Sequence, residues 1–243
     1  MIAKTLVICP LQVELRYLAE GFRKLGAEVQ TESREIRCGR NVGNESQSLT
    51  IEKKIEKIYF VPERNFILVR GGHGKVEFAV RTLQWLSHFG EEVGFAICVG
   101  GAGGLATELQ IGDVLVAENI IEHDYIERFD QNAKSPMFSG HAEMLARVSA
   151  INAKFGFHWR VCLVASGDED IIDSVRAEEL VKKTSAHGVA WEGAGGARAC
   201  RSHQIPFLEI RGITDNARHE VAANFAKNLE VAMANVAKFL WHY

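Results

Sequence analysis

Short apolar runs recur along the chain and alternate with segments of helical period. The runs are rich in Val and Ile, and few of them alternate between apolar and polar residues, which is typical of strands buried on both faces. We therefore predict six strands, at residues 5–9, 66–69, 95–99, 114–121, 161–165 and 207–213.

Between several of these runs, apolar residues return every three or four positions, which predicts amphipathic helices over residues 11–22, 76–86 and 221–240. Strands that alternate with helices favour a parallel sheet covered by helices on both faces. The fold class expected is therefore α/β, as a three-layer αβα arrangement. Its central sheet is mixed, mostly parallel and twisted, and one domain spans residues 1–243.

Two segments do not fit this alternation. Residues 29–56 are polar and contain few core residues, so we expect a loop or an edge hairpin. Residues 125–140 show no period at all. A loop of that length within a compact domain is usually a lid or part of an interface.

Composition and charge narrow the classes of function. Hydrophobic residues make up 47% of the 243 positions, and the formal net charge is −3. Without a clustered basic face, nucleic acid is not an expected partner. The apolar N-terminal run is too short to span a bilayer, so we expect a cytoplasmic protein without a membrane partner. The five cysteines include no C-x-x-C pair and are expected to be reduced. No residue spacing predicts a metal site, and we expect no cofactor.

Two glycine-rich segments are candidates for ligand binding. VGGAGGLA, at residues 99–106, satisfies a loose dinucleotide pattern, but another strand follows it where that fold requires a helix. Gly101 and its neighbours instead suggest a backbone that a ligand approaches closely. RGGHGKVEFAV, at residues 70–80, is a glycine turn that opens a helix with free N–H groups. His73 in this turn is a candidate ligand contact, and an exposed turn histidine is the alternative.

Two acidic residues give the strongest signal. Glu192 lies between an apolar segment and a run of small residues, and Asp215 ends the apolar run 207–213. α/β enzymes place reactive groups at the carboxyl ends of buried parallel strands, so acids at such positions are candidates for catalysis. Taken singly, each acid fits a capping or ion-pairing role equally well.

Six segments, taken in order and spacing, resemble the purine nucleoside phosphorylase and nucleosidase superfamily. They are most similar to its methylthioadenosine/S-adenosylhomocysteine nucleosidases. The segments are VICPLQVEL, GGHGKVEFA, VGGAGGLATELQIGDVLVAENIIEHD, ASGDED, AWEGAGGARAC with IPFLEIRGITDNA, and NF at 224–225. The resemblance implies an N-glycosyl hydrolase that acts on a purine nucleoside, often 5′-modified, and that forms a homo-oligomer, typically a dimer.

The resemblance also implies roles for individual residues. Glu14 matches the glutamate that activates the attacking water, and Asp215 matches the aspartate that protonates the leaving base. Glu192 matches the glutamate that binds the ribose hydroxyls. The other expected substrate-binding residues are Gly101, His73, Asp170, Ile171, Trp191, Thr214 and Phe225.

Two departures from the family pattern leave the substrate open. Asp170 stands where these relatives usually carry a phenylalanine that stacks on the base, and Trp191 replaces a methionine. The segment before the glycine-rich turn lacks the arginine of phosphorolytic relatives, and Glu14 would repel phosphate, so hydrolysis is favoured. Arg70 keeps phosphorolysis as an alternative. A nucleoside-binding protein without turnover is the third reading.

Overall fold

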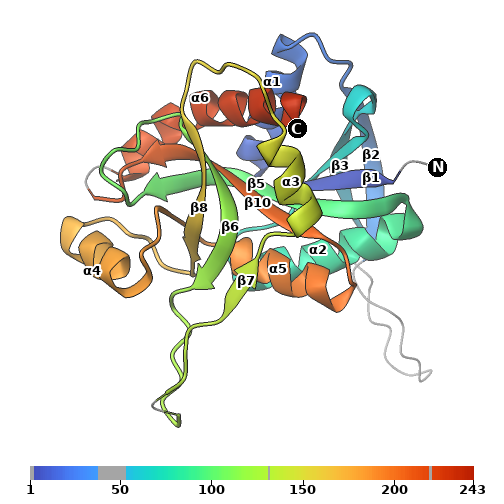
Figure 1. The fold of residues 1–243 in the computed structure, drawn as a ribbon. Helices are drawn as coiled ribbons and strands as arrows, with labels where there is room; N and C mark the ends of the chain where they lie inside the picture. Colours follow the sequence, from blue (N-terminus) through green and yellow to red (C-terminus); the bar gives the residue numbers. More distant parts are fainter. Residues whose placement is uncertain (1–2, 38–52, 131, 219–220) are drawn as a thin grey trace, which may run out of the picture.

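One continuous sheet forms the centre of the molecule (Figure 1). The computed structural model describes residues 3–37, 53–130, 132–218 and 221–243. Four strands pair in parallel at the middle of the sheet: β4 (Phe66–Arg70), β1 (Lys4–Cys9), β5 (Val93–Gly104) and β10 (Phe207–Asp215). Their carboxyl ends therefore meet at one edge, where α/β folds bind ligands.

Beyond β5 and β10 the sheet closes on itself. Three more strands complete the ring: β6 (Val114–Glu122), β8 (Trp159–Ser166) and β9 (Gly188–Ala190). β10 pairs with β6, β6 with β8, β8 with β9, and β9 returns to β5. The closure is barrel-like and brings the ends of β5, β8, β9 and β10 around one space. The short strand β7 (Met137–Ser139) pairs with β6 outside the ring.

The polar segment 29–56 contributes to an edge of the sheet. β2 (Gln30–Arg37) pairs antiparallel with β3 (Lys53–Val61), and β3 pairs with β4. The pairing agrees with the expected edge hairpin, although residues 38–52 of that segment lie outside the described residues.

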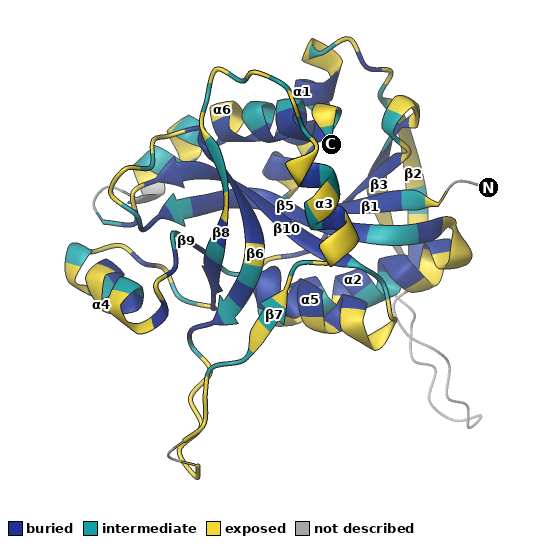
Figure 2. Cartoon of the chain, in the orientation of Figure 1, coloured by how far each residue is buried: buried dark blue, intermediate teal, exposed yellow. Residues whose placement is uncertain are grey.

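Helices cover both faces of the sheet (Figures 1 and 2). On one face lie α1 (Gln12–Lys24), α3 (Ala142–Ser149) and α6 (Val221–His242), and on the other lie α2 (Lys75–Phe89) and α5 (Gly193–Ser202). A separate apolar core fills each side. α4 (Ser174–Thr184) packs beside the closed part of the sheet. Of two 3₁₀ turns, η1 (Pro62–Arg64) connects β3 to β4, and η2 (Gly90–Glu92) connects α2 to β5. The expected α/β architecture with flanking helices is confirmed.

Sequence periodicity missed α3, α4, α5 and the short strands β7 and β9. α5 has the sequence GAGGARACRS, and three glycines in ten residues oppose helix formation. It forms because its small residues allow close packing: a Cβ at Gly195 would collide with the backbone of Lys75 on α2. Close tertiary packing therefore outweighs the weak local propensity of this segment.

The segment between β6 and β7 leaves the body of the molecule as an extended arm (Figure 1). It belongs to the irregular stretch 125–140, most of which has no regular secondary structure. None of the helices in the described part of the chain is long and apolar enough to cross a membrane.

Candidate active site

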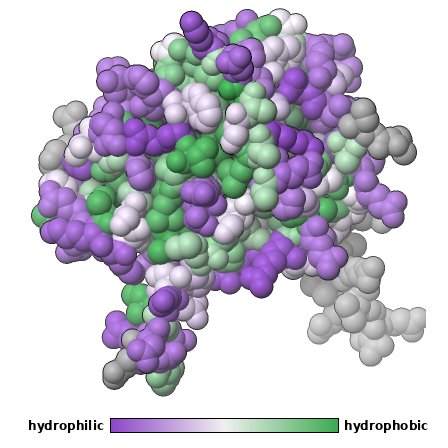
Figure 3. Space-filling model, viewed as in Figure 1, coloured by the Kyte–Doolittle hydropathy of each residue, from purple (hydrophilic) through white to green (hydrophobic). Residues whose placement is uncertain are grey.

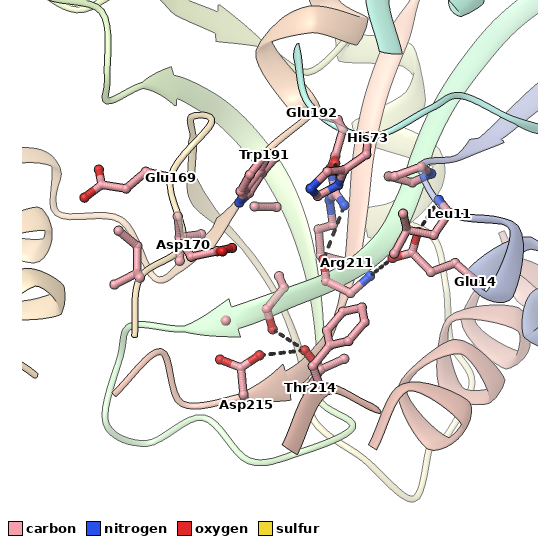
Figure 4. Close-up of a pocket in the computed structure, with 18 of the residues that line it drawn as sticks. Leu11, Glu14, His73, Glu169, Asp170, Trp191, Glu192, Arg211, Thr214 and Asp215 are labelled. Carbon is pink, nitrogen blue, oxygen red and sulfur yellow. Dashed lines mark hydrogen bonds and ion pairs between the residues drawn. The ribbon is translucent and has the colours of Figure 1, made fainter. Parts of the chain in front are cut away.

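A cavity of about 330 Å³ opens at the carboxyl ends of the central strands (Figure 4). Its size is in the range of small-molecule sites. All ten residues expected to act on or bind substrate line it, together with Arg211, Glu169 and several apolar side chains. The ten are Glu14, His73, Gly101, Asp170, Ile171, Trp191, Glu192, Thr214, Asp215 and Phe225.

Glu14 lies in the first turn of α1, and its side chain is buried. One carboxylate oxygen accepts a hydrogen bond from the backbone N–H of Gly101 at 2.8 Å, and the other accepts one from the N–H of Leu11 at 2.8 Å. Burial, followed by the negative charge of Glu192, raises the pKa of Glu14 to about 7. A carboxylate with that pKa is suited to accept a proton near neutral pH.

Glu192 occupies the N-cap position of α5, and its side chain faces Arg211, which projects from β10. The guanidinium donates to the Glu192 carboxylate at 3.1 Å, and the N–H of Gly74 donates to its other oxygen at 3.3 Å. Burial alone would raise the pKa of Glu192, but the hydrogen bond from His73 and the charge of Arg211 outweigh it, and the pKa is lowered. Glu192 is therefore ionised and in a fixed position.

His73 and Trp191 form a stacked pair at the mouth of the cavity. Their ring centroids lie 4.1 Å apart, and His73 Nδ1 lies 3.5 Å from the Glu192 carboxylate. The contact with Glu192 raises the pKa of His73. Trp191 is only partly buried and lines the cavity, so it is not a residue of the apolar core. His73 is exposed, as one alternative expected, but its ring still faces the site.

Asp215 ends β10 at a different part of the cavity from Glu14 and Glu192 (Figure 4). It accepts hydrogen bonds from the Thr214 hydroxyl and from the N–H of Ala217, each at 2.8 Å. Burial raises the pKa of Asp215, and these two hydrogen bonds offset the shift only in part. The environment therefore favours a protonated carboxyl more than water would.

The glycines at the end of β5 make room for these groups. A Cβ at Gly100 would stand 2.7 Å from both Arg211 and Glu14, and one at Gly101 would stand 2.9 Å from Phe225. The glycine-rich segment thus permits side chains that line the cavity to approach the backbone closely. The N–H groups at the start of α2 bind carboxylates of the protein: that of Lys75 donates to Asp168 at 2.8 Å, and that of Gly74 donates to Glu192 at 3.3 Å.

The loop after β8 carries Asp170 and Ile171 to the side of the cavity nearest Asp215. Ile171 is buried, whereas Asp170 is exposed and its carboxylate points into the open space (Figure 4). The loop is held by its neighbours: Glu169 accepts two hydrogen bonds from Arg176, at 2.6 and 2.8 Å. Asp170 is thus presented by an anchored backbone.

Arg211 is a central residue that the sequence interpretation did not include. It is fully buried and contacts Glu192, Glu209, Cys98 and the carbonyl oxygen of Gly101. Two opposite charges, at positions 209 and 211 of the otherwise apolar run 207–213, were the available signal. Arg70, the cation considered for phosphate, does not line the cavity and lies 3.5 Å from Glu77.

In the part of the chain that the structure describes, no group of three His, Cys, Asp or Glu side chains could hold a metal ion. Four cysteines, Cys9, Cys98, Cys162 and Cys200, are free and buried, and Cys38 lies outside the described residues.

The fold and this site define a member of the phosphorylase superfamily, to which the chain belongs: the model of that family matches residues 6–243. The 5′-methylthioadenosine/S-adenosylhomocysteine nucleosidase of Marinomonas sp. (strain MWYL1) is 31% identical over 192 residues, 71% of this chain and 77% of that protein. The enzyme of the same name from Staphylococcus aureus (strain JH9) is 29% identical over 178 residues, 70% and 77% of the two chains. These relatives confirm the expected enzyme class, an N-glycosyl hydrolase.

Solved structures show the same fold. Futalosine hydrolase of Helicobacter pylori strain 26695 superposes with a TM-score of 0.79 at 25% identity, over 100% of this chain and 97% of that one. A 5′-methylthioadenosine/S-adenosylhomocysteine nucleosidase of Helicobacter pylori gives a TM-score of 0.78 at 24% identity, over 99% and 97%.

Proposed function

We propose that this protein hydrolyses the N-glycosidic bond of a 5′-modified purine nucleoside and releases the free base. One observation carries the proposal: a single cavity holds three buried carboxylates in different electrostatic states. The pKa of Glu192 is lowered, that of Glu14 is about 7, and that of Asp215 is raised. When the surroundings of neighbouring acids shift their pKa values in different directions, one acid is suited to act as a base and another as a proton donor.

Glu14 and Glu192 act on the sugar side of the glycosidic bond. As the bond to the base breaks, positive charge develops on the ribose, and carboxylates nearby stabilise that charge. Glu192, which stays ionised, binds the ribose hydroxyls. Glu14 accepts a proton from a water molecule, which then bonds to the sugar carbon that the base leaves.

The base end belongs to Asp215. The departing purine gains negative charge, and a proton delivered to a ring nitrogen neutralises it. A protonated Asp215 can donate that proton, while the hydrogen bond from the N–H of Ala217 fixes the other carboxyl oxygen. Asp215 is placed apart from Glu14, so that the acid and the base act on opposite ends of the bond.

Water suits this cavity better than phosphate as the nucleophile. Phosphate needs a cationic cradle. Among the described residues that line the cavity, Arg211 is the only arginine or lysine, and its hydrogen bonds go to Glu192 at 3.1 Å and Glu209 at 2.7 Å. Glu14 adds negative charge beside it. The nucleosidases and the hydrolase among the similar proteins support the same choice.

A base-release assay tests the proposal. Purified protein is incubated with a panel of purine nucleosides that includes 5′-methylthioadenosine, S-adenosylhomocysteine and futalosine, and free base is quantified by chromatography. We expect release at a rate that does not change when phosphate is added. Strict dependence on phosphate would show phosphorolysis instead, and calorimetric binding without base release would show a nucleoside-binding protein.

We further propose that Asp170 selects bases that present N–H donors to it. Its carboxylate lies at the base end of the cavity, and no hydrogen bond to a described residue occupies it. A hydrogen bond to a charged group contributes about 1.5–3 kcal/mol. Asp170→Asn is therefore expected to reduce the preference for amino-substituted purines over their oxo counterparts by about 10-fold or more. Paired kcat/KM values for adenosine- and inosine-type substrates measure that preference, and an unchanged ratio would contradict the assignment.

We also propose that the protein forms a homodimer. Figure 3 shows apolar side chains on the surface of the arm. Phe129 on the arm is fully exposed, and on α2 Val76 and Val80 are 74% and 49% exposed. Such surfaces are typical of contacts between subunits. We expect the Val76→Lys/Val80→Lys variant to sediment as a monomer and the wild type as a dimer. Val231→Lys, the same change at an exposed position on α6, is the control. A monomeric wild type at micromolar concentration would reject the proposal.

A further inference from the structure

Glu209 is a buried acid with no access to the cavity. It is the third of the nine residues of β10, has no exposed surface, and lies two residues before Arg211 on the same face of the strand. One carboxylate oxygen accepts a hydrogen bond from Arg211 Nε at 2.7 Å. That is the shortest contact of the guanidinium with any described residue; the contacts with Glu192, Cys98 and Gly101 are 3.1, 3.2 and 3.3 Å.

We propose that Glu209 is a positioning residue of the hydrolysis: by holding Arg211 it sets the orientation of Glu192 and the charge that reaches Glu14. The inference rests on the proposed function. It concerns a residue outside the cavity, for which the matched family motifs imply no role.

The geometry supports an orienting role. A guanidinium is planar and rigid, so a partner on Nε determines where both terminal nitrogens point. With Nε bound to Glu209, one terminal nitrogen reaches the Glu192 carboxylate and the other reaches the carbonyl oxygen of Gly101. The N–H of that same Gly101 binds Glu14. Glu209 therefore connects, through one side chain, to both acids at the sugar end of the site.

The fold makes room for this carboxylate although it is costly to bury. The second oxygen of Glu209 finds no hydrogen-bond partner among the described residues, and a Cβ at Gly193 would collide with it. A buried carboxylate with an unsatisfied oxygen destabilises a protein relative to an apolar side chain of similar volume. A role in the site would explain why the chain carries a carboxylate at a position where it lowers the stability of the fold.

The charge balance gives a second reason. Glu14, Glu192 and Glu209 all interact electrostatically with the guanidinium of Arg211. The other titratable groups nearby are the thiol of Cys98, which faces Glu192 and Glu209, the thiol of Cys9, which faces Glu14, and His73 at the mouth, which faces Glu192, Glu14 and Asp170. Burial raises the pKa of Glu209, and the charge and hydrogen bond of Arg211 counteract that rise. In its ionised form Glu209 compensates part of the guanidinium charge on the side away from the cavity. Less of it reaches Glu14, which keeps a proton affinity high enough to act as a base.

Glu209→Gln tests this inference because glutamine can still accept the hydrogen bond from Arg211 Nε while the charge is removed. More of the guanidinium charge then reaches Glu14, and we expect the acidic limb of the kcat/KM profile to move to lower pH by about half a unit or more. Glu209→Leu removes the hydrogen bond as well, and we expect kcat to fall about 10–100-fold through misplacement of Glu192. Glu56→Gln, which neutralises another buried partner of an arginine, Arg81, away from the cavity, is the matched control.

A second measurement does not need turnover. The imidazole of His73 is titrated by NMR, with His73→Asn to assign the signal, and its pKa is expected to fall in Glu209→Gln because the site becomes less negative. An acidic limb and a His73 titration that both stay at their wild-type values would overturn the inference, even if Glu209→Leu fails to fold. If the wild type releases no base at all, the proposed function fails, and the His73 titration still decides whether Glu209 acts on the site.

Discussion

Asp215→Asn is expected to lower kcat for purine nucleosides about 10²–10⁴-fold, which is the usual contribution of a positioned proton donor. Asparagine matches the aspartate in size and can keep the contacts with Thr214 and Ala217, so KM should change far less than kcat. What the variant loses is the proton for the leaving base. Steady-state base release at saturating substrate measures the effect.

Two comparisons separate an acid from a structural residue at this position. A nitrophenyl riboside has a leaving group that needs no proton, so Asp215→Asn should cleave it with a much smaller loss. Asp113→Asn makes the same change in another buried aspartate, which accepts hydrogen bonds from the N–H groups of Gln110 and His158 outside the cavity. Equal losses on both substrates would mean that Asp215 does not act as the acid.

Glu14→Gln is expected to reduce kcat/KM by about 10²–10⁴-fold at pH 8, because glutamine cannot take a proton from the attacking water. In the wild type, Glu14 acts in its ionised form and its pKa is about 7. Activity should therefore fall about tenfold per unit as the pH drops below 7, and it should level off above that value. The residual activity of the variant should lack this acidic limb.

The stability of the variant provides the control. The pKa of Glu14 rises from 4.5 to about 7 on folding, so the folded protein holds this proton more tightly than the unfolded chain. Ionised Glu14 therefore lowers the stability of the fold as the pH rises from 4.5 to about 7. At pH 8, Glu14→Gln should unfold at the same or a higher temperature than the wild type. Glu122→Gln, in a buried acid that binds Lys75 outside the cavity, should retain activity. An acidic limb that persists in Glu14→Gln would assign the base to another residue.

The fold class, and ten of the residues that line the cavity, were predictable from the order of residues. Runs such as Val-Gly-Phe-Ala-Ile-Cys in β5 carry no polar residues on either face. A continuous apolar run of this kind predicts a strand that is buried on both faces. Glu14, Glu192 and Asp215 were identified because each belongs to a motif whose spacing is distinctive. These local features do not depend on where distant segments meet.

Three features depended on where distant segments meet. α5 is rich in glycine and is stabilised by packing against α2 and β10, which no local propensity reports. The closure of the sheet arises from the pairing of β9 with β5, over 80 residues apart in sequence. In the sequence, the arm between β6 and β7 could be recognised only because residues 125–140 lack a hydrophobic period. Apolar residues without a period do not predict a conformation.

The chemistry of the acids shows the same division. Their identity and order were readable along the chain, but a carboxylate acquires its pKa from its surroundings. Glu14 becomes a candidate base because the fold buries it beside Glu192, and Glu192 stays ionised because Arg211 and His73 face it. Along the chain, Arg211 and Glu209 are two charges in an apolar run. Only the fold shows that Arg211 lines the cavity and that Glu209 is buried behind it. Desolvation and Coulomb interactions depend on distances through space, which a linear sequence does not contain.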